Sequence, residues 1–520
     1  MEHEVGSQLE VEVDDREGLE HERAQVILEE VYAGLKPAEV WHHFAFLNAI
    51  PRPSKLEARA RAYVQRVAQS AGAMWRVDGA GNIVVYKEGS EAGSGEGAEG
   101  AVAIQAHLDM VCERVPERSI NWSRDPIIPV RVEGRIEAMG TTLGADNGIG
   151  AAMALALLST PGLSHPPLEL LFTVEEETGL QGASRLDGSL LSARRLLNLD
   201  TEKPDEIIIG CAGGRGVDLS LPIEREPCES KCLTFALAVG GLAGGHSGVQ
   251  IAEPLGNAIQ ILAQSLRFLE GELKFRLVEA HGGNARNAIP RDARALVIVD
   301  AGDAERFQQL VRGLEADLRV QWHEREPSLT LKSSPAESAL APLTSGSSRV
   351  LVDLLFESPH GVLAWSQRWP GKVETSCNLA TLSTGEEEAR VHISGRSFRE
   401  AELQAWQDSV QVLASLHNAQ TSLHDGYPGW EPSEEPAGES SLREMAAQAF
   451  ERVAGARPKI EIVHAGLECG IILSKCPGME AISFGPLIRG AHTPEEYVDI
   501  ASVEHSWRIL VELLQQLQKA

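Results

Sequence analysis

The sequence contains little of what membrane-spanning, disulfide-bonded and nucleic-acid-binding proteins need. Its 520 residues include no apolar run of about eighteen residues, so we expect no transmembrane helix. Seven cysteines are few and odd in number, and Cys228-x-x-x-Cys232 lacks a partner pair, which predicts reduced thiols in a cytoplasmic protein. The chain has 47 lysines and arginines and 75 aspartates and glutamates, which gives a net charge of −28. This charge argues against nucleic acid and anionic membranes as partners.

What the chain does contain is the composition of a folded protein with several domains. Hydrophobic residues make up 43% and charged residues 23%, as in globular domains. A chain of 520 residues is too long for one ordinary core, so we expect two or more domains. The acidic start Met1-Glu2-His3-Glu4 has no apolar segment behind it, and we expect no secretory signal. Residues 1–36 are polar and acidic, which predicts a loosely attached extension with one short helix near residues 24–32.

Polar side chains recur where predicted buried strands end. The apolar run 101–104 leads to His107 and Asp109, which share one face of an extended chain. Three further sets follow the same pattern: Asp146 in Gly140-Thr141-Thr142-Leu143-Gly144-Ala145-Asp146-Asn147-Gly148-Ile149-Gly150, Glu176 and Glu177 after the run 168–174, and Asp200 after the run 196–199. Because sites in open α/β sheets form beyond the carboxyl ends of the strands, we expect these side chains to meet. An imidazole with several carboxylates suits zinc, manganese or cobalt.

Each motif also has a structural interpretation when it is taken alone. The His-x-Asp motif can be a histidine satisfied within a core. The glycine-rich block can be a turn in which Asp146 or Asn147 caps an apolar helix over 149–158. The three glutamates at 175–177 can be a solvated acidic loop, although adjacent carboxylates repel one another unless a cation or water relieves them. Recurrence at successive strand ends favours a common site over these alternatives.

The pattern changes after Gly213-Gly214 to alternating segments between amphipathic helices. Alternation at 233–239 and 391–393, with helices predicted over 257–269 and 304–318, indicates an inserted α+β domain with an antiparallel sheet. Turn residues accumulate near Tyr427, and after them the pattern of apolar strands that end in polar residues returns.

Taken in this order, the motifs resemble those of the aminoacylase–carnosinase family of di-zinc metallopeptidases, and within it the branch of aminoacyl-histidine dipeptidases. The resemblance runs from about residue 37 to the C-terminus. The acidic extension and a Gly/Glu-rich segment over 88–100, predicted to be a flexible loop, are not part of it. The residues that carry it are His107-Leu108-Asp109-Met110-Val111, the block around Asp146, Glu176-Glu177-x-Gly179, Asn198-Leu199-Asp200, His464-Ala465-Gly466-Leu467-Glu468-Cys469-Gly470 and Gly490-Ala491-His492-Thr493-Pro494-Glu495-Glu496.

The resemblance implies an α/β fold, with a di-zinc peptidase catalytic domain built on a mixed, mostly parallel sheet and an inserted α+β lid and dimerisation domain. The catalytic domain then covers residues 37–213 and 429–520, the lid covers 214–428, and residues 1–36 remain an extension.

Two divalent metal ions are implied, zinc before manganese or cobalt, bridged by one aspartate and by a water or hydroxide. By the resemblance, His107 and Asp200 hold one ion and Glu177 and His492 hold the other. Asp146 is the bridging aspartate.

The remaining roles are implied in the same way. Asp109 orients His107, and Glu176 is the general base. His246 in the insertion is nominated as the donor to the oxyanion, and Arg396 with Asn287 is nominated to bind the substrate's C-terminal carboxylate.

Two residues of the block at 464–470 bear on the substrate. Gly466 lies where the family's substrate-contacting loop runs. Glu468 can bind the substrate's free amine or can be structural, and the sequence leaves both open.

The implied function is metal-dependent hydrolysis of the peptide bond of unblocked dipeptides, Xaa-His among them. One alternative is a related di-zinc amidohydrolase, namely a tripeptidase, a carboxypeptidase or an N-acyl amino acid deacylase. The other is a non-catalytic binding protein on the same fold. The resemblance further implies a cytoplasmic homodimer that pairs through the lid domain.

Overall fold

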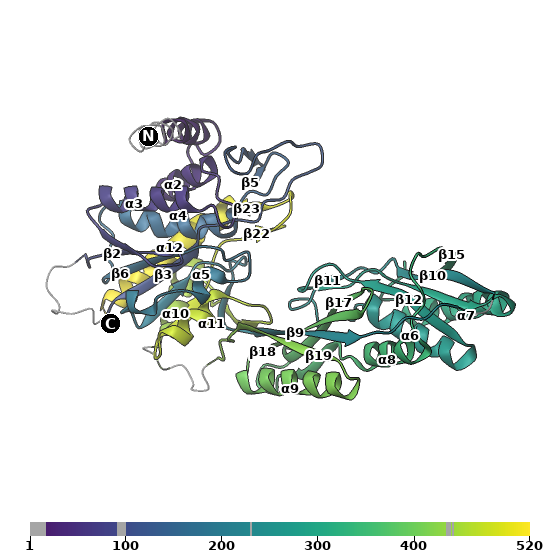
Figure 1. Cartoon of the computed structure of the whole chain (residues 1–520). Coiled ribbons are helices and arrows are strands. Elements are labelled where there is room, and N and C mark those ends of the chain that lie inside the picture. Colours follow the sequence, from purple (N-terminus) through teal and green to yellow (C-terminus); the bar gives the residue numbers. More distant parts are fainter. Residues whose placement is uncertain (1–16, 91–99, 229–230, 433–437, 439–440, 520) are drawn as a thin grey trace, which may run out of the picture. The chain divides into compact units, whose positions relative to one another are not determined.

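The computed structural model describes residues 17–90, 100–228, 231–432, 438 and 441–519. The chain divides into two compact units, each with its own sheet (Figure 1). The first unit comprises Met1–Gly210, Pro432–Ile462 and Leu467–Ala520, and the second comprises Cys211–Glu431 and Val463–Gly466. The insertion predicted over 214–428 falls within the second unit.

The first unit is built on an eight-stranded mixed sheet. Its helices and strands are α2 (Ala38–Ala49), α3 (Ala58–Ser70), β1 (Met74–Val77), β2 (Ile83–Lys87), β3 (Val102–His107), β4 (Pro129–Val132), β5 (Arg135–Ala138), α4 (Ala145–Ser159), β6 (Leu168–Thr173), α5 (Gln181–Ser184), β7 (Arg195–Asn198), β8 (Glu206–Cys211), α10 (Leu442–Ala454), β20 (Lys459–Val463), α11 (Glu468–Lys475), β21 (Glu480–Ser483), β22 (Ile488–Arg489), β23 (Tyr497–Asp499) and α12 (Ile500–Lys519). Across the sheet the strands run β1-β2-β6-β3-β7-β21-β8-β20.

The strands in the middle of this sheet are parallel. β6, β3, β7 and β21 are parallel neighbours, whereas β1 pairs antiparallel with β2, β2 with β6, and β8 with β21. Every residue of β3 and β6 is buried, which explains why these strands are continuous apolar runs in the sequence. The ends of the parallel strands place His107, Glu176 and Asp200 at one edge of the sheet.

The N-terminal region is packed against the first unit where the structure describes it. Residues 17–30 form a helix, Ala24 is buried, and Glu20 forms an ion pair with Arg59 of α3. Tyr32 donates a hydrogen bond from its hydroxyl to Asn48 Oδ1 at 2.6 Å. The prediction of a loose extension was therefore wrong for this part, because a few apolar residues among many acidic ones suffice to anchor a helix. Residues 1–16, and residues 91–99 of the predicted flexible loop, lie outside the described residues.

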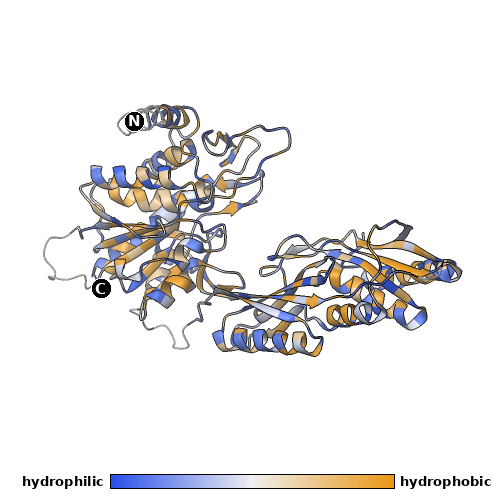
Figure 2. Cartoon of the chain, viewed as in Figure 1, coloured by the Kyte–Doolittle hydropathy of each residue, from blue (hydrophilic) through white to orange (hydrophobic). Residues whose placement is uncertain are grey.

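The second unit carries a nine-stranded antiparallel sheet. Its elements are β9 (Gly213–Pro222), β10 (Cys232–Gly240), β11 (Gly245–His246), α6 (Ala258–Glu272), β12 (Phe275–Gly282), β13 (Ala288–Ile289), β14 (Ala293–Asp300), α7 (Ala304–Trp322), β15 (Thr330–Pro335), α8 (Ser345–Glu357), β16 (Gly361–Trp365), β17 (Val373–Thr384), β18 (Glu388–Ser397), α9 (Glu400–Leu416) and β19 (Gln420–Tyr427). Hydrophilic and hydrophobic residues alternate along α9 (Figure 2), and its Leu403, Trp406 and Val410 are buried.

The nine-stranded sheet consists of two halves with the same internal order. Apart from the short strands β11, β13 and β16, one half runs β10, α6, β12, β14, α7 and β15, and the other runs β9, α8, β17, β18, α9 and β19. In space the strands run β15-β10-β14-β12-β17-β18-β9-β19, so the halves read 4-1-3-2 and 2-3-1-4. The two second strands, β12 and β17, pair antiparallel at the centre. The half from β10 to β15 is inserted between β9 and α8 of the other half. The two copies are therefore not consecutive in the sequence, and the repeat was not predicted.

The cysteines differ from the prediction in one respect. Cys228 and Cys232 are joined by a disulfide, so the interpretation of all seven cysteines as reduced thiols was wrong for these two. Their Cα atoms lie 6.9 Å apart. The other five cysteines, all within the described part of the chain, form no disulfide.

In the ranges that the structure describes, no helix combines the length and the apolar character needed to cross a membrane.

Candidate metal centre and substrate-binding residues

The five predicted metal ligands converge in the first unit. His107 is the last residue of β3, Glu177 follows β6, and Asp200 follows β7. Asp146 lies in the first turn of α4, and His492 precedes β23. Parallel strands that end at the same edge of the sheet, together with the start of a helix behind them, thus assemble residues that are far apart in the sequence.

The two carboxylate oxygens of Asp146 face different residues. Oδ1 lies 3.2 Å from His107 Nε2, which is itself 3.6 Å from Asp200 Oδ1. Oδ2 lies 3.2 Å from His492 Nε2, which is 3.1 Å from Glu177 Oε2. Ligands held about 2.0 Å from a tetrahedral metal ion lie roughly 3.3 Å from one another. The five side chains therefore form two groups with metal-ligand spacing that share Asp146.

The electrostatics of this centre favour a cation. The carboxylates of Asp146 and Glu177 raise the pKa of His492 to about 11. Burial alone would lower the pKa of His107, but Asp200 and its other acidic neighbours hold it well above its usual value. Burial raises the pKa of Asp200, and the negative charge of Asp146 raises it further. Several carboxylates are thus buried around two imidazoles, an arrangement that a bound cation would stabilise.

The residues present fit a pair of divalent metal ions. All the converging atoms are imidazole nitrogens and carboxylate oxygens, the donor set of zinc, manganese and cobalt sites. Within the described residues, the buried Glu177 Oε1 has no hydrogen-bond partner, which is expected of an oxygen that faces an ion.

His492 adopts a left-handed backbone conformation, with φ of 66°. This conformation costs a residue with a side chain of the order of 1–3 kcal/mol and persists where the surrounding structure enforces it. At this position it directs the imidazole toward Asp146.

Asp109 ties the ligands of both groups together. Its Oδ1 accepts a hydrogen bond from the backbone N–H of Glu176 at 3.1 Å, and its Oδ2 accepts one from Glu177 at 3.2 Å. His107 Nδ1 lies 3.5 Å from Asp109 Oδ1 and 3.1 Å from the Asp109 carbonyl oxygen. Burial would raise the pKa of Asp109, but hydrogen bonds from His107 and Ser54 lower it below its usual value. Asp109 therefore positions both His107 and the two glutamates.

Three supporting residues escaped the sequence analysis. The carboxylate of Glu496 accepts hydrogen bonds from the backbone N–H groups of residues 143–146, at 2.7–3.2 Å, and so fixes the approach to Asp146. The buried Arg52 donates from Nη1 to the carbonyl oxygens of Leu108 and Asp109, both at 3.0 Å. Ser54 donates to Asp109 Oδ2 at 2.7 Å. Of the three, only Glu496 lies in a motif of the sequence analysis, the block at 490–496, and that block predicts a role for His492 alone.

Glu468 begins α11, and its carboxylate contacts Gln105, which lies two residues before His107 on β3. Its Oε2 accepts hydrogen bonds from Thr173 at 2.6 Å and from Gln105 at 2.5 Å, and the residue is 0% exposed. Burial raises the pKa of Glu468 to about 7. These contacts favour the structural role over binding of a substrate amine.

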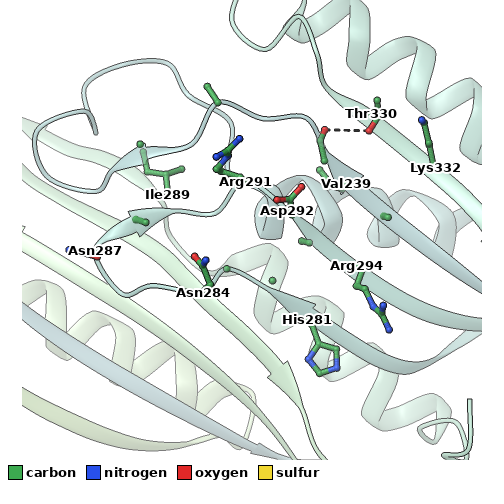
Figure 3. Close-up of a pocket in the computed structure, with 18 of the residues that line it drawn as sticks. Val239, His281, Asn284, Asn287, Ile289, Arg291, Asp292, Arg294, Thr330 and Lys332 are labelled. Carbon is green, nitrogen blue, oxygen red and sulfur yellow. Dashed lines mark hydrogen bonds between the residues drawn. The ribbon is translucent and has the colours of Figure 1, made fainter. Parts of the chain in front are cut away.

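In the second unit, His246 and Asn287 line one pocket of about 960 Å³ (Figure 3). β11 pairs with β13, which places His246 opposite Ala288, and Ser247 donates its backbone N–H to the Asn287 carbonyl oxygen at 2.8 Å. Arg291, Arg294 and Lys332 also line the pocket, which makes it basic on a strongly acidic protein.

The tautomer of His246 is set by its own loop. Nδ1 accepts hydrogen bonds from the backbone N–H groups of Gly248 at 3.2 Å and Val249 at 3.0 Å. An imidazole whose Nδ1 is an acceptor carries its proton on Nε2. His246 therefore presents an N–H donor through Nε2.

Arg396 and Gly466 lie in the same region of the second unit. Arg396 donates from Nη1 to the hydroxyl oxygen of Tyr427 at 2.6 Å. A Cβ added to Gly466 would lie 2.7 Å from the Tyr427 ring, and one added to Gly248 would lie 3.1 Å from Arg396 Nε. The four predicted residues of this unit thus form one neighbourhood around His246 and Arg396, to which the structure adds Tyr427.

Comparison with known proteins shows the family of this chain. The chain is 37% identical over 487 residues to a cytosol non-specific dipeptidase of Escherichia coli strain K12, a match that covers 93% of this chain and 98% of that one. The crystal structure of aminoacylhistidine dipeptidase from Vibrio alginolyticus matches with a TM-score of 0.81 and 33% identity, and covers 94% of this chain and 99% of that one. An aminopeptidase structure from Bacillus cereus, at 16% identity and a TM-score of 0.52 over 93% of this chain and 99% of that one, shares the fold. The model of peptidase family M20/M25/M40 matches residues 103–516, and the chain belongs to this family.

Proposed function

We propose that this protein is a metal-dependent dipeptidase that hydrolyses unblocked dipeptides, Xaa-His dipeptides among them. The observation that carries the proposal is the pair of ligand groups that share Asp146, with Glu176 beside Glu177. Its similarity over nearly the whole chain to a cytosol non-specific dipeptidase supports the choice of substrate class. Two divalent ions bound there, zinc before manganese or cobalt, would polarise the scissile carbonyl and lower the pKa of water.

The protein's own residues do the rest of the chemistry. Glu176 takes the proton of the attacking water and delivers it to the leaving amine. Burial raises the pKa of Glu176, and the adjacent Glu177 raises it further, whereas the positive charge of His107 lowers it. Asp109 holds the backbone of this glutamate pair in place.

The second unit supplies groups for the substrate. His246 Nε2–H is the donor to the carbonyl oxygen as negative charge develops on it. Arg396 and Asn287 bind the C-terminal carboxylate of the dipeptide, because a guanidinium matches a carboxylate in a bidentate way. Among the described residues, the buried Arg396 Nε has no hydrogen-bond partner, so it can bind a ligand without first losing a protein contact. Because residue 466 has no side chain, its backbone can lie against the ring of Tyr427, which contacts Arg396.

The substrate class is tested by the release of free amino acids from a small panel. Protein loaded with zinc, manganese or cobalt is given several Xaa-His and other dipeptides, a tripeptide and an N-acetyl amino acid. We expect rapid release from the dipeptides only, its loss on chelation and its return with metal. Preferred cleavage of the tripeptide or the N-acetyl amino acid would instead assign a related amidohydrolase. Stable metal binding with no hydrolysis at all would assign a binding protein.

Amidation of the dipeptide's C-terminus should raise KM by about 10–100-fold, because it removes the charge that Arg396 binds, a hydrogen bond of about 1.5–3 kcal/mol. KM and kcat are measured for a dipeptide and for its amide. As a matched control, Arg396→Gln should bind the two forms about equally. Equal KM values in the wild-type protein would exclude a carboxylate-binding role for Arg396.

We also propose that the protein is a cytoplasmic homodimer that pairs through the second unit. Phe356 on α8 and Val412 and Leu416 on α9 are apolar and 47–72% exposed, which supports a contact on this helical face. The name of the related cytosol dipeptidase supports the compartment.

A further inference from the structure

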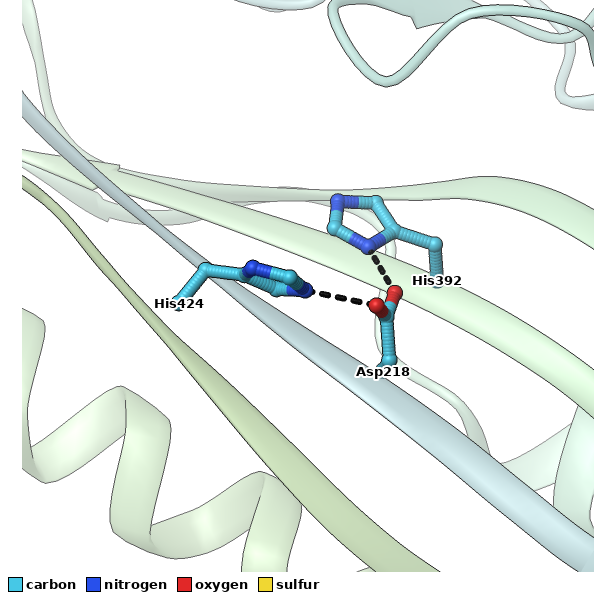
Figure 4. Close-up of side chains that lie close together, drawn as sticks. All are labelled: Asp218, His392 and His424. Atoms are coloured by element: carbon cyan, nitrogen blue, oxygen red, sulfur yellow. Dashed lines mark hydrogen bonds and ion pairs between the residues drawn. The ribbon is translucent and has the colours of Figure 1, made fainter.

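A second cluster of metal-ligating residue types lies in the nine-stranded sheet, on the adjacent strands β18, β9 and β19 (Figure 4). His392 lies directly opposite Asp218 in the register, and His424 lies opposite Gly216, two residues along the same face. His392 Nδ1 is 2.5 Å from Asp218 Oδ1, and His424 Nε2 is 2.6 Å from Asp218 Oδ2. Each imidazole therefore directs one nitrogen at a different oxygen of a single carboxylate.

Gly216 provides the space in which the two rings meet. A Cβ at this position would lie 2.8 Å from His392 Cε1 and 3.5 Å from His424 Cδ2. Real Cβ atoms do not approach as closely as 2.8 Å, so any other residue would push the His392 ring away. The absence of a side chain at residue 216 is thus part of the geometry of the cluster.

We propose that Asp218, His392 and His424 form a mononuclear binding site for a divalent transition metal ion, with zinc as the best match. The three ligating atoms lie within 4.8 Å of one another. Two imidazole nitrogens and one carboxylate oxygen are a common zinc donor set, and three protein ligands leave a fourth position for water. The ion would replace the protons through which the imidazoles now bind the carboxylate.

The burial of the three residues suits this role. His392 is 5% exposed, so protein contacts hold its ring in place beside Asp218. Asp218 and His424 are half-buried, at 37% and 38% side-chain exposure, so an ion from solution can reach the cluster.

A neighbouring cation gives the site a distinctive signature. Arg286 Nη2 lies 3.2 Å from Asp218 Oδ2, the oxygen that also faces His424. A guanidinium and a metal ion would compete for this oxygen. The Arg286 side chain is 58% exposed, so it can move into water when an ion binds. Removal of Arg286 should therefore strengthen metal binding, whereas a cluster held only by hydrogen bonds predicts no such gain.

The test is a count of zinc ions on the full-length protein. Wild type, His424→Ala, Asp218→Asn and Arg286→Ala are dialysed against a series of buffered free Zn²⁺ concentrations, and bound zinc is measured by elemental analysis. We expect His424→Ala and Asp218→Asn to bind one zinc ion fewer per chain than the wild type. Arg286→Ala should fill the same site at a several-fold lower free Zn²⁺ concentration. His417→Ala is the matched control, because His417 contacts the carboxylate of Glu357 at 2.9 Å in the same unit but belongs to no such cluster.

Because each result is a difference between proteins that keep the first centre, it does not depend on how many ions that centre holds. Cobalt gives a second measurement: the wild-type visible absorption of the added Co²⁺ should exceed that of His424→Ala by the spectrum of one ion. Equal zinc contents and equal cobalt spectra in wild type, His424→Ala and Asp218→Asn would overturn the proposal and leave a hydrogen-bonded cluster.

Discussion

Glu176→Gln should keep its metal ions and lose turnover by about 10²–10⁴-fold, the usual contribution of a general base. Glutamine has nearly the same volume and keeps a hydrogen-bonding side chain, but it cannot take a proton from water. The backbone contact between Glu176 N–H and Asp109 Oδ1 does not involve the altered group, so the local structure should persist. Metal per chain and kcat are measured on the same preparation.

The adjacent Glu177→Gln is the matched control. Glu177 Oε2 lies 3.1 Å from His492 Nε2 in one of the two ligand groups, so its amide should weaken metal binding first and activity as a consequence. Added metal should partly restore the activity of Glu177→Gln but not that of Glu176→Gln. If both variants lost metal equally, the assignment within the glutamate pair would be wrong.

His246→Ala should lose turnover by about 10²–10³-fold, the typical cost of one oxyanion donor, with both metal ions and the fold retained. The physical reason is the tautomer: Gly248 and Val249 donate to Nδ1, so the proton of the ring lies on Nε2. His246→Gln keeps an N–H donor of similar reach and should recover part of the loss. Turnover close to the wild-type value in His246→Ala would remove the oxyanion role.

A mixture of variants tests whether His246 acts within its own chain or on a partner's substrate. Inactive His246→Ala and inactive Glu176→Gln chains are mixed under conditions in which subunit exchange is demonstrated separately. Recovered activity means that one chain supplies the donor and the other the base. Exchange without recovery means that each chain uses its own His246.

The convergence of the proposed metal ligands was predictable because they follow a rule of chain geometry. His107 ends β3, Glu177 lies in the turn after β6, and Asp200 follows β7, and parallel strands deliver such residues to one edge of a sheet. The support around them was not predictable, since it depends on contacts between distant segments. Glu496 binds the backbone about 350 residues away in the sequence, and no local pattern marks such a partner.

The inserted unit was predicted only as a class of structure. Alternation and amphipathic helices indicate an antiparallel sheet with helices on it, but they do not state which strands are neighbours. The cluster around Asp218 is the clearest case. Its three residues belong to separate segments, and only the β18-β9-β19 register brings them together.

The repeated strand order in this unit has a consequence for how the protein evolved. Two equivalent β-α-β-β-α-β halves that pair antiparallel through their second strands have the geometry of an isologous dimer contained in one chain. In such a dimer the two subunits have identical sequences. Once both are contained in one chain, each half can change independently of the other. The divergence is visible in two corresponding hollows at the ends of β10 and β9: Arg294 and Lys332 line one, and Glu386 and Glu387 line the other. Gene duplication followed by specialisation would thus have given one half the histidine donor and the other the arginine. A partner chain must then bind elsewhere, because the edges of β12 and β17 are already paired within the chain.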